Sequence, residues 1–167
     1  LIAKVEYFAQ ITTQKQKNAV FAIHISKFVN LTTGLISKVI GLPVKRFIAA
    51  TNSNDTVPRF LHEHIWNPHQ TQATLSNAMD VSNPNNWPRI QHFLDVGLIN
   101  KADMMAEAVT EQETIKTVQS LDSLGYLSEP HAAVAYFALQ QNLQDGEFGV
   151  FLGTAHPAKF QESVQAI

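Results

Sequence analysis

The chain has 167 residues, of which 45% are hydrophobic and 16% are charged, and its formal net charge is −2 at pH 7. This composition is typical of a soluble globular protein with one core of ordinary size, for which we expect a cytoplasmic location, and it argues against disorder and against nucleic-acid binding. No apolar run approaches the roughly 20 residues that span a bilayer, and a chain without cysteine has neither disulfides nor thiolate chemistry.

The first third of the chain predicts two strands separated by a helix. Residues 19–23 and 44–50 are short apolar runs that are typical of buried strands. Between them, apolar residues recur at helical spacing from 31 to 40, with Asn30 as the expected N-cap and Gly41 as the expected terminator. Before them, the spacing of apolar residues from 2 to 8 predicts a helix.

The middle of the chain is less regular. Asp55 is the expected cap of a short helix over residues 57–61. Residues 70–84 have weak periodicity and many small polar side chains, so they predict an ordered loop that lies on the domain. A helix is expected to resume at Asn86.

The last third predicts two helices and a strand. Thr110 to Glu113 has capping-box spacing and opens a helix that ends near Gly125, with Leu121 and Leu124 expected in the core. A second helix starts at residues 128–130, residues 150–152 form a strand, and another helix begins near residue 157. Strands that alternate with helices predict one α/β domain over residues 1–167, with a parallel sheet covered on both faces.

Four separated stretches carry a family resemblance: residues 41–60, 73–81, 125–136 and 151–160, the last reading Phe-Leu-Gly-Thr-Ala-His-Pro-Ala-Lys-Phe. Together and in this order they resemble bacterial threonine synthases, which are pyridoxal-phosphate enzymes of the tryptophan-synthase-β-like fold, also called fold type II. The resemblance implies a three-layer αβα domain. It also implies an incomplete one, because the chain looks like the central-to-late part of a full synthase.

Members of the family convert O-phosphohomoserine and water to threonine and phosphate, with pyridoxal phosphate held as a Schiff base to a lysine. The resemblance places that lysine in a Ser-Phe-Lys-Asp-like segment of the amino-terminal region, and no such segment occurs in this chain. We therefore assign no catalytic residue and expect the chain alone to be inactive. The alternative is a non-catalytic interaction or structural domain that pairs with a separate polypeptide covering the truncated sheet.

The resemblance also points to cofactor-binding residues. Where the family has a Ser-Gly-Asn-Phe-Gly phosphate turn, only Phe28 is kept, while Ser26 and Val29 stand at the two glycine positions. Val29 is poorly suited to a positive φ, and Lys27 supplies a charge but does not restore convergent amides. Thr154 aligns with the residue whose hydroxyl meets the pyridine nitrogen; alternatively, it only caps the helix that follows.

Asn52, Asn54, Asp55 and Arg59 follow the second strand, and the resemblance makes them substrate-binding candidates. Arg59 is suited to a phosphate or carboxylate group. The alternative is a hydrogen-bonded turn in which Asp55 caps a helix.

Three further groups have weaker functional interpretations. Residues 76–80, Ser-Asn-Ala-Met-Asp, are a family marker whose simplest role is to secure a long loop. His131 opens a helix that faces the expected cofactor, but a packed histidine at a helix start is the commoner case. The histidines at 62, 64 and 69 do not favour a metal site, because His-x-His puts both rings on one face only in a strand.

Overall fold

The structure is a computed structural model that describes all residues except 1–5, 7, 13–17 and 166. Four strands form one parallel sheet in the order β3-β2-β1-β4: β1 (Ala19–His24), β2 (Val44–Thr51), β3 (Met104–Ala108) and β4 (Phe148–Phe151). After residue 18, the helices of the described part are α2 (Val29–Val39), α3 (Thr56–Glu63), α4 (Trp87–Asp95), α5 (Glu111–Ser123), α6 (Pro130–Asn142) and α7 (Gln161–Gln165). Short 3-10 helices are η1 (Asn77–Met79), η2 (Lys101–Asp103) and η3 (Pro157–Phe160).

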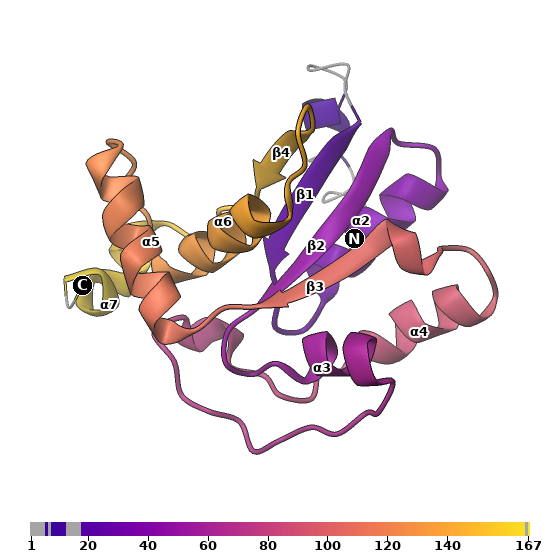
Figure 1. The fold of residues 1–167 in the computed structure, drawn as a ribbon, viewed down its shortest axis with the longest axis horizontal. Helices are drawn as coiled ribbons and strands as arrows, with labels where there is room; N and C mark the ends of the chain where they lie inside the picture. The colour runs from indigo at the N-terminus through magenta and orange to yellow at the C-terminus, as the bar shows by residue number, and fades with distance from the viewer. Residues whose placement is uncertain (1–5, 7, 13–17, 166) are drawn as a thin grey trace.

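The sheet lies between two helical layers (Figure 1). Alternate residues of each strand point to opposite faces, so Phe21 and Phe47 enter a core cluster with residues of α2 and α4. On the other face, Val20 and Ile48 pack with residues of α6. Helix α5 packs outside α6. The predicted three-layer α/β architecture with a parallel sheet is confirmed.

Local sequence signals are confirmed where they depend on neighbouring residues alone. The side chain of Thr110 accepts a hydrogen bond from the amide of Glu113, whose carboxylate accepts from the amide of Thr110, so the capping box of α5 is complete. Gly41 and Gly125 follow α2 and α5 with φ of 101° and 81°, the left-handed conformation that glycine adopts at helix ends.

Three local predictions are wrong. Helix α2 begins at Val29, and its N-cap is Phe28 rather than Asn30. Asp55 occupies the N-cap position of α3, but its side chain makes no capping hydrogen bond and instead pairs with Arg59. Leu124 is 71% exposed and does not belong to the core, because α5 ends at Ser123 and the chain turns away.

Strand β3 was not predicted from the sequence. Its residues, Met-Met-Ala-Glu-Ala, include no β-branched side chain and are good helix formers. They adopt a strand because they pair in parallel with β2, from Phe47 opposite Met104 to Thr51 opposite Ala108. Tertiary pairing therefore overrides local propensity here.

Part of the helix predicted near the start of the chain, including Ile2 and Val5, lies outside the described residues. Phe8 is described and buried, and its ring meets that of Phe21 edge to face with centroids 5.0 Å apart. Among the described residues, no helix combines the length and apolar character needed to cross a membrane.

Candidate functional site

The four parallel strands end at the same edge of the sheet, which is where α/β proteins bind ligands. The segments that leave this carboxyl edge are residues 25–28 after β1, 52–55 after β2, 109–110 after β3 and 152–156 after β4. The loop before α6 carries Glu129, the N-cap residue of that helix. The sequence-predicted cofactor residues and Asn52, Asn54 and Asp55 therefore lie on segments of one edge, whereas Arg59 lies in α3, which follows one of these segments.

Buried polar atoms without a hydrogen-bond partner concentrate at this edge. Within the described part of the chain they are both ring nitrogens of His24, Thr51 Oγ1, Glu111 Oε1 and His131 Nε2, which belong to strand ends or helix starts at the carboxyl edge. Buried polar groups in folded proteins are almost always paired, so an unpaired cluster calls for an explanation such as a ligand. This cluster is a functional signal that the sequence motifs did not reveal.

The segment at the position of the expected phosphate turn forms a pocket of about 190 Å³, lined by residues 24–30 and Met79. The left-handed residue of this segment is Phe28, with φ of 62°, whereas Val29 already has helical geometry. Val29, which is poorly suited to a positive φ, therefore does not have one in this structure. Phe28 tolerates the position because its buried ring packs edge to face against Trp87.

Ser26 and Lys27 border this pocket from the same segment. Lys27 is exposed, and its ammonium has no ion pair or hydrogen bond with any described residue. Its backbone carbonyl accepts a hydrogen bond from the side-chain amide of Asn86, which ties the segment to the start of α4.

Thr154 lies exposed in the turn after β4. The N-cap of η3 is His156, whose Nδ1 accepts a hydrogen bond from the amide of Ala158 at 3.2 Å. The alternative interpretation, in which Thr154 only caps this helix, is therefore wrong. No described residue hydrogen-bonds to the Thr154 hydroxyl, so it is available to a ligand.

The substrate-side candidates Asn52 and Asn54 are engaged with the protein. Both are buried, and the Asn52 amide donates to Thr74, Ser76 and Asp80 at 2.8–2.9 Å. Asn54 donates to the carbonyl of residue 72 and accepts from the amide of the same residue.

These bonds explain the family marker at residues 76–80. Asp80 accepts from both asparagines and from the hydroxyl and amide of Thr74. Its carboxylate thereby joins the long loop to the turn after β2. The interpretation that the marker secures the loop is confirmed.

Arg59 is held one turn into α3. Its Nε donates to Asp55 at 2.9 Å, four residues back, and one Nη donates to the carbonyl of Asn67. These contacts fix the guanidinium without using its remaining Nη. Arg59 therefore remains the anion-binding candidate after β2.

His131 is a buried residue at the start of α6. Its Nδ1 hydrogen-bonds the carboxylate of Glu129, which also accepts from the amides of His131 and Ala132 and so caps the helix. The ring lies tilted beside the rings of Phe160 and His24, with centroids 4.4 Å and 5.6 Å away. The packed interpretation is correct for Nδ1, while Nε2 remains unpaired.

His24 is 1% exposed at the end of β1. Burial first, and the neighbouring His131 second, lower the pKa of His24 from 6.5 to about 3. The imidazole is therefore neutral at physiological pH. A neutral imidazole has one N–H donor and one acceptor nitrogen, and within the described part of the chain neither nitrogen makes a hydrogen bond of good geometry.

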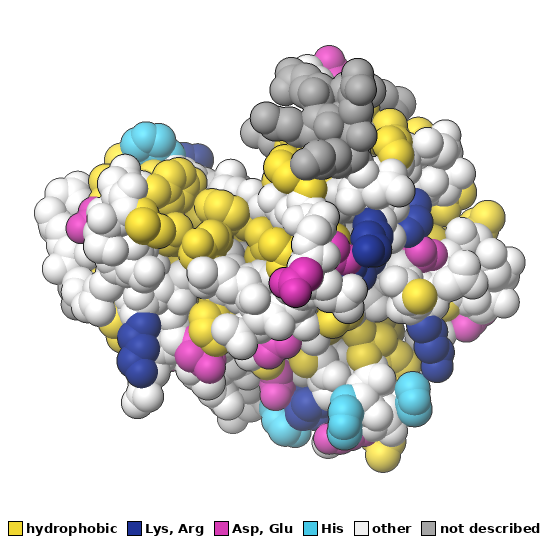
Figure 2. All heavy atoms as spheres, turned by 45° about the horizontal axis from the view of Figure 1, so that its top comes forward, with side chains coloured by type: hydrophobic (Ala, Val, Ile, Leu, Met, Phe, Trp, Pro, Cys, Tyr) yellow, Lys and Arg dark blue, Asp and Glu magenta, His cyan; other side chains and the backbone are white. Residues whose placement is uncertain are grey.

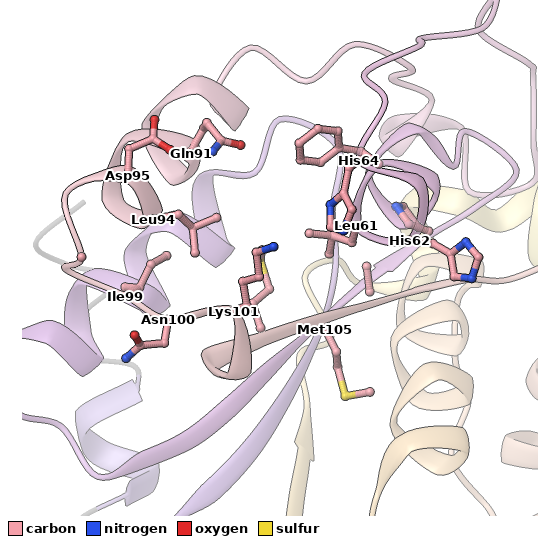
Figure 3. A pocket seen from close by; sticks show the side chains of 15 residues that line it. Leu61, His62, His64, Gln91, Leu94, Asp95, Ile99, Asn100, Lys101 and Met105 are labelled. Atoms are coloured by element: carbon pink, nitrogen blue, oxygen red, sulfur yellow. Dashed lines mark hydrogen bonds between the residues drawn. The ribbon is translucent and has the colours of Figure 1, made fainter.

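A second, larger pocket of about 700 Å³ lies beside the first half of β3, between α3 and α4 (Figure 3). Leu61, Leu94 and Ile99 point into it, and His62 and His64 lie at its rim. Among the described residues, we find no group of three or more histidine, cysteine or acidic side chains that could hold a metal ion. No sequence motif indicated this pocket, because residues from three separate segments build it.

Comparison with known proteins identifies the relatives of this chain. It is 53% identical to the threonine synthase of Serratia marcescens over 171 aligned positions, which cover 100% of this chain and 40% of the relative. The crystal structure of threonine synthase from Escherichia coli superimposes with a TM-score of 0.92 at 53% identity, covering 98% of this chain and 39% of that one. The pyridoxal-phosphate-bound threonine synthase of Brucella melitensis gives a TM-score of 0.88 at 26% identity, covering 98% and 41%.

No family model matches the chain. The chain spans about 40% of the length of its curated relatives from Serratia marcescens and Escherichia coli, whose alignments cover all of this chain. The alignment covers the whole of this chain, and the fold superimposes on the solved synthase of Escherichia coli. The chain therefore belongs to the threonine synthase family and corresponds to a part of the length of its members.

Proposed function

We propose that this chain forms the phosphate and pyridine walls of a pyridoxal-phosphate site in a threonine synthase that acts on O-phosphohomoserine. The unpaired buried polar atoms at the carboxyl edge are the observation that carries the proposal, since a bound ligand would satisfy them. The similarity to synthases, one of which is solved with pyridoxal phosphate, indicates which ligand to expect.

The residues present fit two ends of the cofactor. A phosphate group fits a pocket of about 190 Å³ at the amino end of α2, where Ser26 and Lys27 border it. Thr154 offers a free hydroxyl to a pyridine nitrogen from the turn after β4. When bound, pyridoxal phosphate supplies the electron sink for the reaction, and these residues hold and orient it.

On the substrate side, we propose that Arg59 binds the phosphate or carboxylate of O-phosphohomoserine through its remaining Nη. Asp55 orients the guanidinium. Asn52 and Asn54 act indirectly, because their amides hold the 72–82 loop over the same edge.

We propose that the chain by itself does not make threonine. The chemistry requires a lysine amine at the reacting carbon of the cofactor, and the Ser-Phe-Lys-Asp-like segment that the family resemblance implies does not occur in these 167 residues. The site is then completed by residues from the remaining 60% or so of the synthase length.

The proposal is tested by complementation. The purified chain is mixed with a polypeptide that comprises the unmatched remainder of the Escherichia coli synthase, pyridoxal phosphate and O-phosphohomoserine, and threonine formation is measured. We expect threonine from the mixture and none from either part alone. Thr154→Val, which keeps the shape and removes the hydroxyl, should lower the rate about tenfold or more.

If the isolated chain forms threonine, the proposal that it cannot do so by itself is wrong. A folded mixture that binds no pyridoxal phosphate and makes no threonine contradicts the proposed site. Thr154→Ser is the matched variant, because it retains the hydroxyl and should retain most of the activity.

A second candidate function, an interaction domain that pairs with a separate polypeptide, is favoured by the apolar surface near β4. In the described sheet β4 has only β1 as a neighbour. Tyr126 and Tyr136 contact Phe151, and Leu143 lies beside Gly149 with 36% of its surface exposed. Figure 2 shows hydrophobic side chains gathered on this face.

Light scattering after size exclusion separates the two candidates. An interaction domain should bind the complementing polypeptide stably without catalysis, and Leu143→Glu should weaken the complex. A chain that stays monomeric at all concentrations and does not bind the remainder of the synthase argues against a partner at this face.

A further inference from the structure

The pocket of about 700 Å³ between α3, α4 and the first half of β3, the β3 pocket, has no part in the proposed function. Its walls come from the two helices, from η2 and from the start of β3, not from the segments at the carboxyl edge of the sheet. Arg59 shows the separation. Residues 58 and 60–62 of α3 line the β3 pocket, whereas Arg59 does not and is held by Asp55 and Asn67.

The walls of the β3 pocket are largely apolar. Ile99 and Met104 are buried and belong to the main core cluster. Leu61 and Leu94 are half-buried, pack against that cluster and point into the hollow (Figure 3). Sites for small molecules are typically hollows of about 300–1,000 Å³ with mainly apolar walls and a few polar groups. The β3 pocket has the size and the lining of such a site.

One cation reaches into this apolar hollow. The side chain of Lys101 comes from η2, and its ammonium points between Leu61 and Leu94 (Figure 3). Among the described residues, this ammonium has no ion pair and no hydrogen bond. His62 and His64 add ring nitrogens at the rim. The polar groups that face a ligand are therefore one ammonium and the edge of two imidazoles.

The acidic side chains of this region have other partners. Asp95 belongs to the wall, but its carboxylate accepts from the side-chain amide of Gln91 at 2.8 Å, and the two side chains lie together in Figure 3. Asp103 follows Lys101 by two residues and pairs instead with Lys38 at 2.7 Å. The charge of Lys101 is thus left without a protein counter-ion, so charge complementarity favours an anionic ligand.

We propose that the β3 pocket binds a small molecule that carries one carboxylate on an apolar body. The apolar body lies between Leu61, Leu94 and Ile99, where it is removed from water, and the carboxylate lies at the Lys101 ammonium. A lone ammonium without convergent amides balances a single negative charge, which is that of a carboxylate rather than a phosphate. The inference goes beyond the proposed function and uses no residue of the cofactor or substrate site.

The test measures binding to the whole chain by amide chemical shifts in nuclear magnetic resonance. The probes are phenylbutyrate, phenylbutanol and phenylbutylamine, which share a terminal phenyl ring and a chain and end in a negative, a neutral and a positive group. We expect phenylbutyrate to shift amides within residues 59–64 and 94–106, to saturate, and to bind about threefold more tightly than the alcohol, with the amine weakest. Phenylpropionate, which has one methylene fewer, should bind about threefold more weakly than phenylbutyrate.

Variants assign the charge recognition to Lys101. Lys101→Met keeps the apolar stem and removes the charge, so it should raise the dissociation constant of phenylbutyrate about threefold and leave that of phenylbutanol unchanged. Lys101→Arg keeps the charge and should stay within about twofold of the unchanged chain. Lys116→Met, which removes an exposed charge on α5, is the matched control for net charge and should change neither constant.

Equal affinities for the three probes would overturn the inference, as would equal phenylbutyrate affinity in Lys101→Met and in the unchanged chain. Shifts confined to the carboxyl edge, at residues 24–30 and 152–156, would also contradict it. A final arm adds the polypeptide that comprises the rest of the synthase. If this polypeptide displaces phenylbutyrate, a segment of the synthase fills the β3 pocket and the inference is wrong, whereas retained binding supports it. Threonine formation by the complemented mixture depends on none of these results, so the inference and the proposed function can fail separately.

Discussion

At the residue scale, several positions are decided by contacts that no sequence window contains. Phe28 has the left-handed backbone conformation, although the family pattern has its glycines at the positions of Ser26 and Val29. Phe28 tolerates this conformation because its ring packs against Trp87. Thr154 does not cap η3, because His156 is the N-cap residue of that helix. By contrast, the capping box of Thr110 and Glu113 was predictable, since both partners lie within four residues.

Gly34 is required by the close approach of α2 to the sheet. A Cβ at this position would lie 2.5 Å from Cε1 of Phe47, which is fully buried and packed against Phe8 and Phe21. Gly34→Ala should therefore lower the free energy of unfolding by about 1–3 kcal/mol, although alanine favours a helix by about 1 kcal/mol. Urea denaturation followed by circular dichroism measures the change.

The control for Gly34→Ala is the same substitution made in a Phe47→Leu background. Because Phe47→Leu removes the ring that a Cβ at Gly34 would meet, Gly34→Ala should lower the free energy of unfolding clearly less in this background than in the unchanged chain. Equal losses in both backgrounds would show that the ring of Phe47 is not what excludes a side chain at Gly34.

At the element scale, an ionic clamp links β2 to the turn before β4 across the intervening strand. Arg46 makes a two-pronged contact with the Glu147 carboxylate and donates to the carbonyl of Asn142 at the end of α6. Lys45 contacts the same carboxylate at 2.7 Å. Only 5% of the Glu147 side chain is exposed, and hydrogen bonding from Arg46, more than any other cause, holds the pKa of Glu147 far below its usual value.

Glu147→Gln should lower the free energy of unfolding by about 2 kcal/mol, because it leaves the Arg46 guanidinium partly buried without its counter-charge. The loss should persist in 0.5 M NaCl, since only 12% of the Arg46 and 5% of the Glu147 side chain is exposed, and salt screens such a part-buried pair weakly. Glu162→Gln, an exposed change on α7, is the matched control and should be neutral. A loss that disappears at high salt would instead identify a surface interaction.

At the scale of the whole molecule, acid should destabilise the fold through His24. In the unfolded chain this imidazole binds a proton below pH 6.5, whereas in the folded protein its pKa is about 3. The unfolded state therefore binds more protons between these two values. Stability must fall as the pH falls from 6.5, by roughly 1 kcal/mol per pH unit.

The measurement compares urea unfolding of the unchanged chain and of His24→Phe at pH 7.0, 6.0 and 5.0. This range lies above the window in which Glu147 loses its own contribution, because that loss begins as the pH falls through the ordinary pKa of the carboxylate, 4.5, and continues toward its lowered pKa in the folded protein. The unchanged chain should lose stability more steeply than the variant. Parallel pH profiles would show that His24 is not the responsible group.

The sequence alone determined the alternation of strands and helices, the capping of α5, the start of α6, and the family, because these depend on local spacing and on motifs read in order. Only the tertiary structure decided that residues 104–108 form a strand, that Asp80 ties the long loop to Asn52, and that the unpaired atoms of His24, Thr51 and His131 meet at one edge. The physical reason is that strand pairing and burial join residues far apart in the chain, and their free energies exceed the local preferences that a sequence pattern reports.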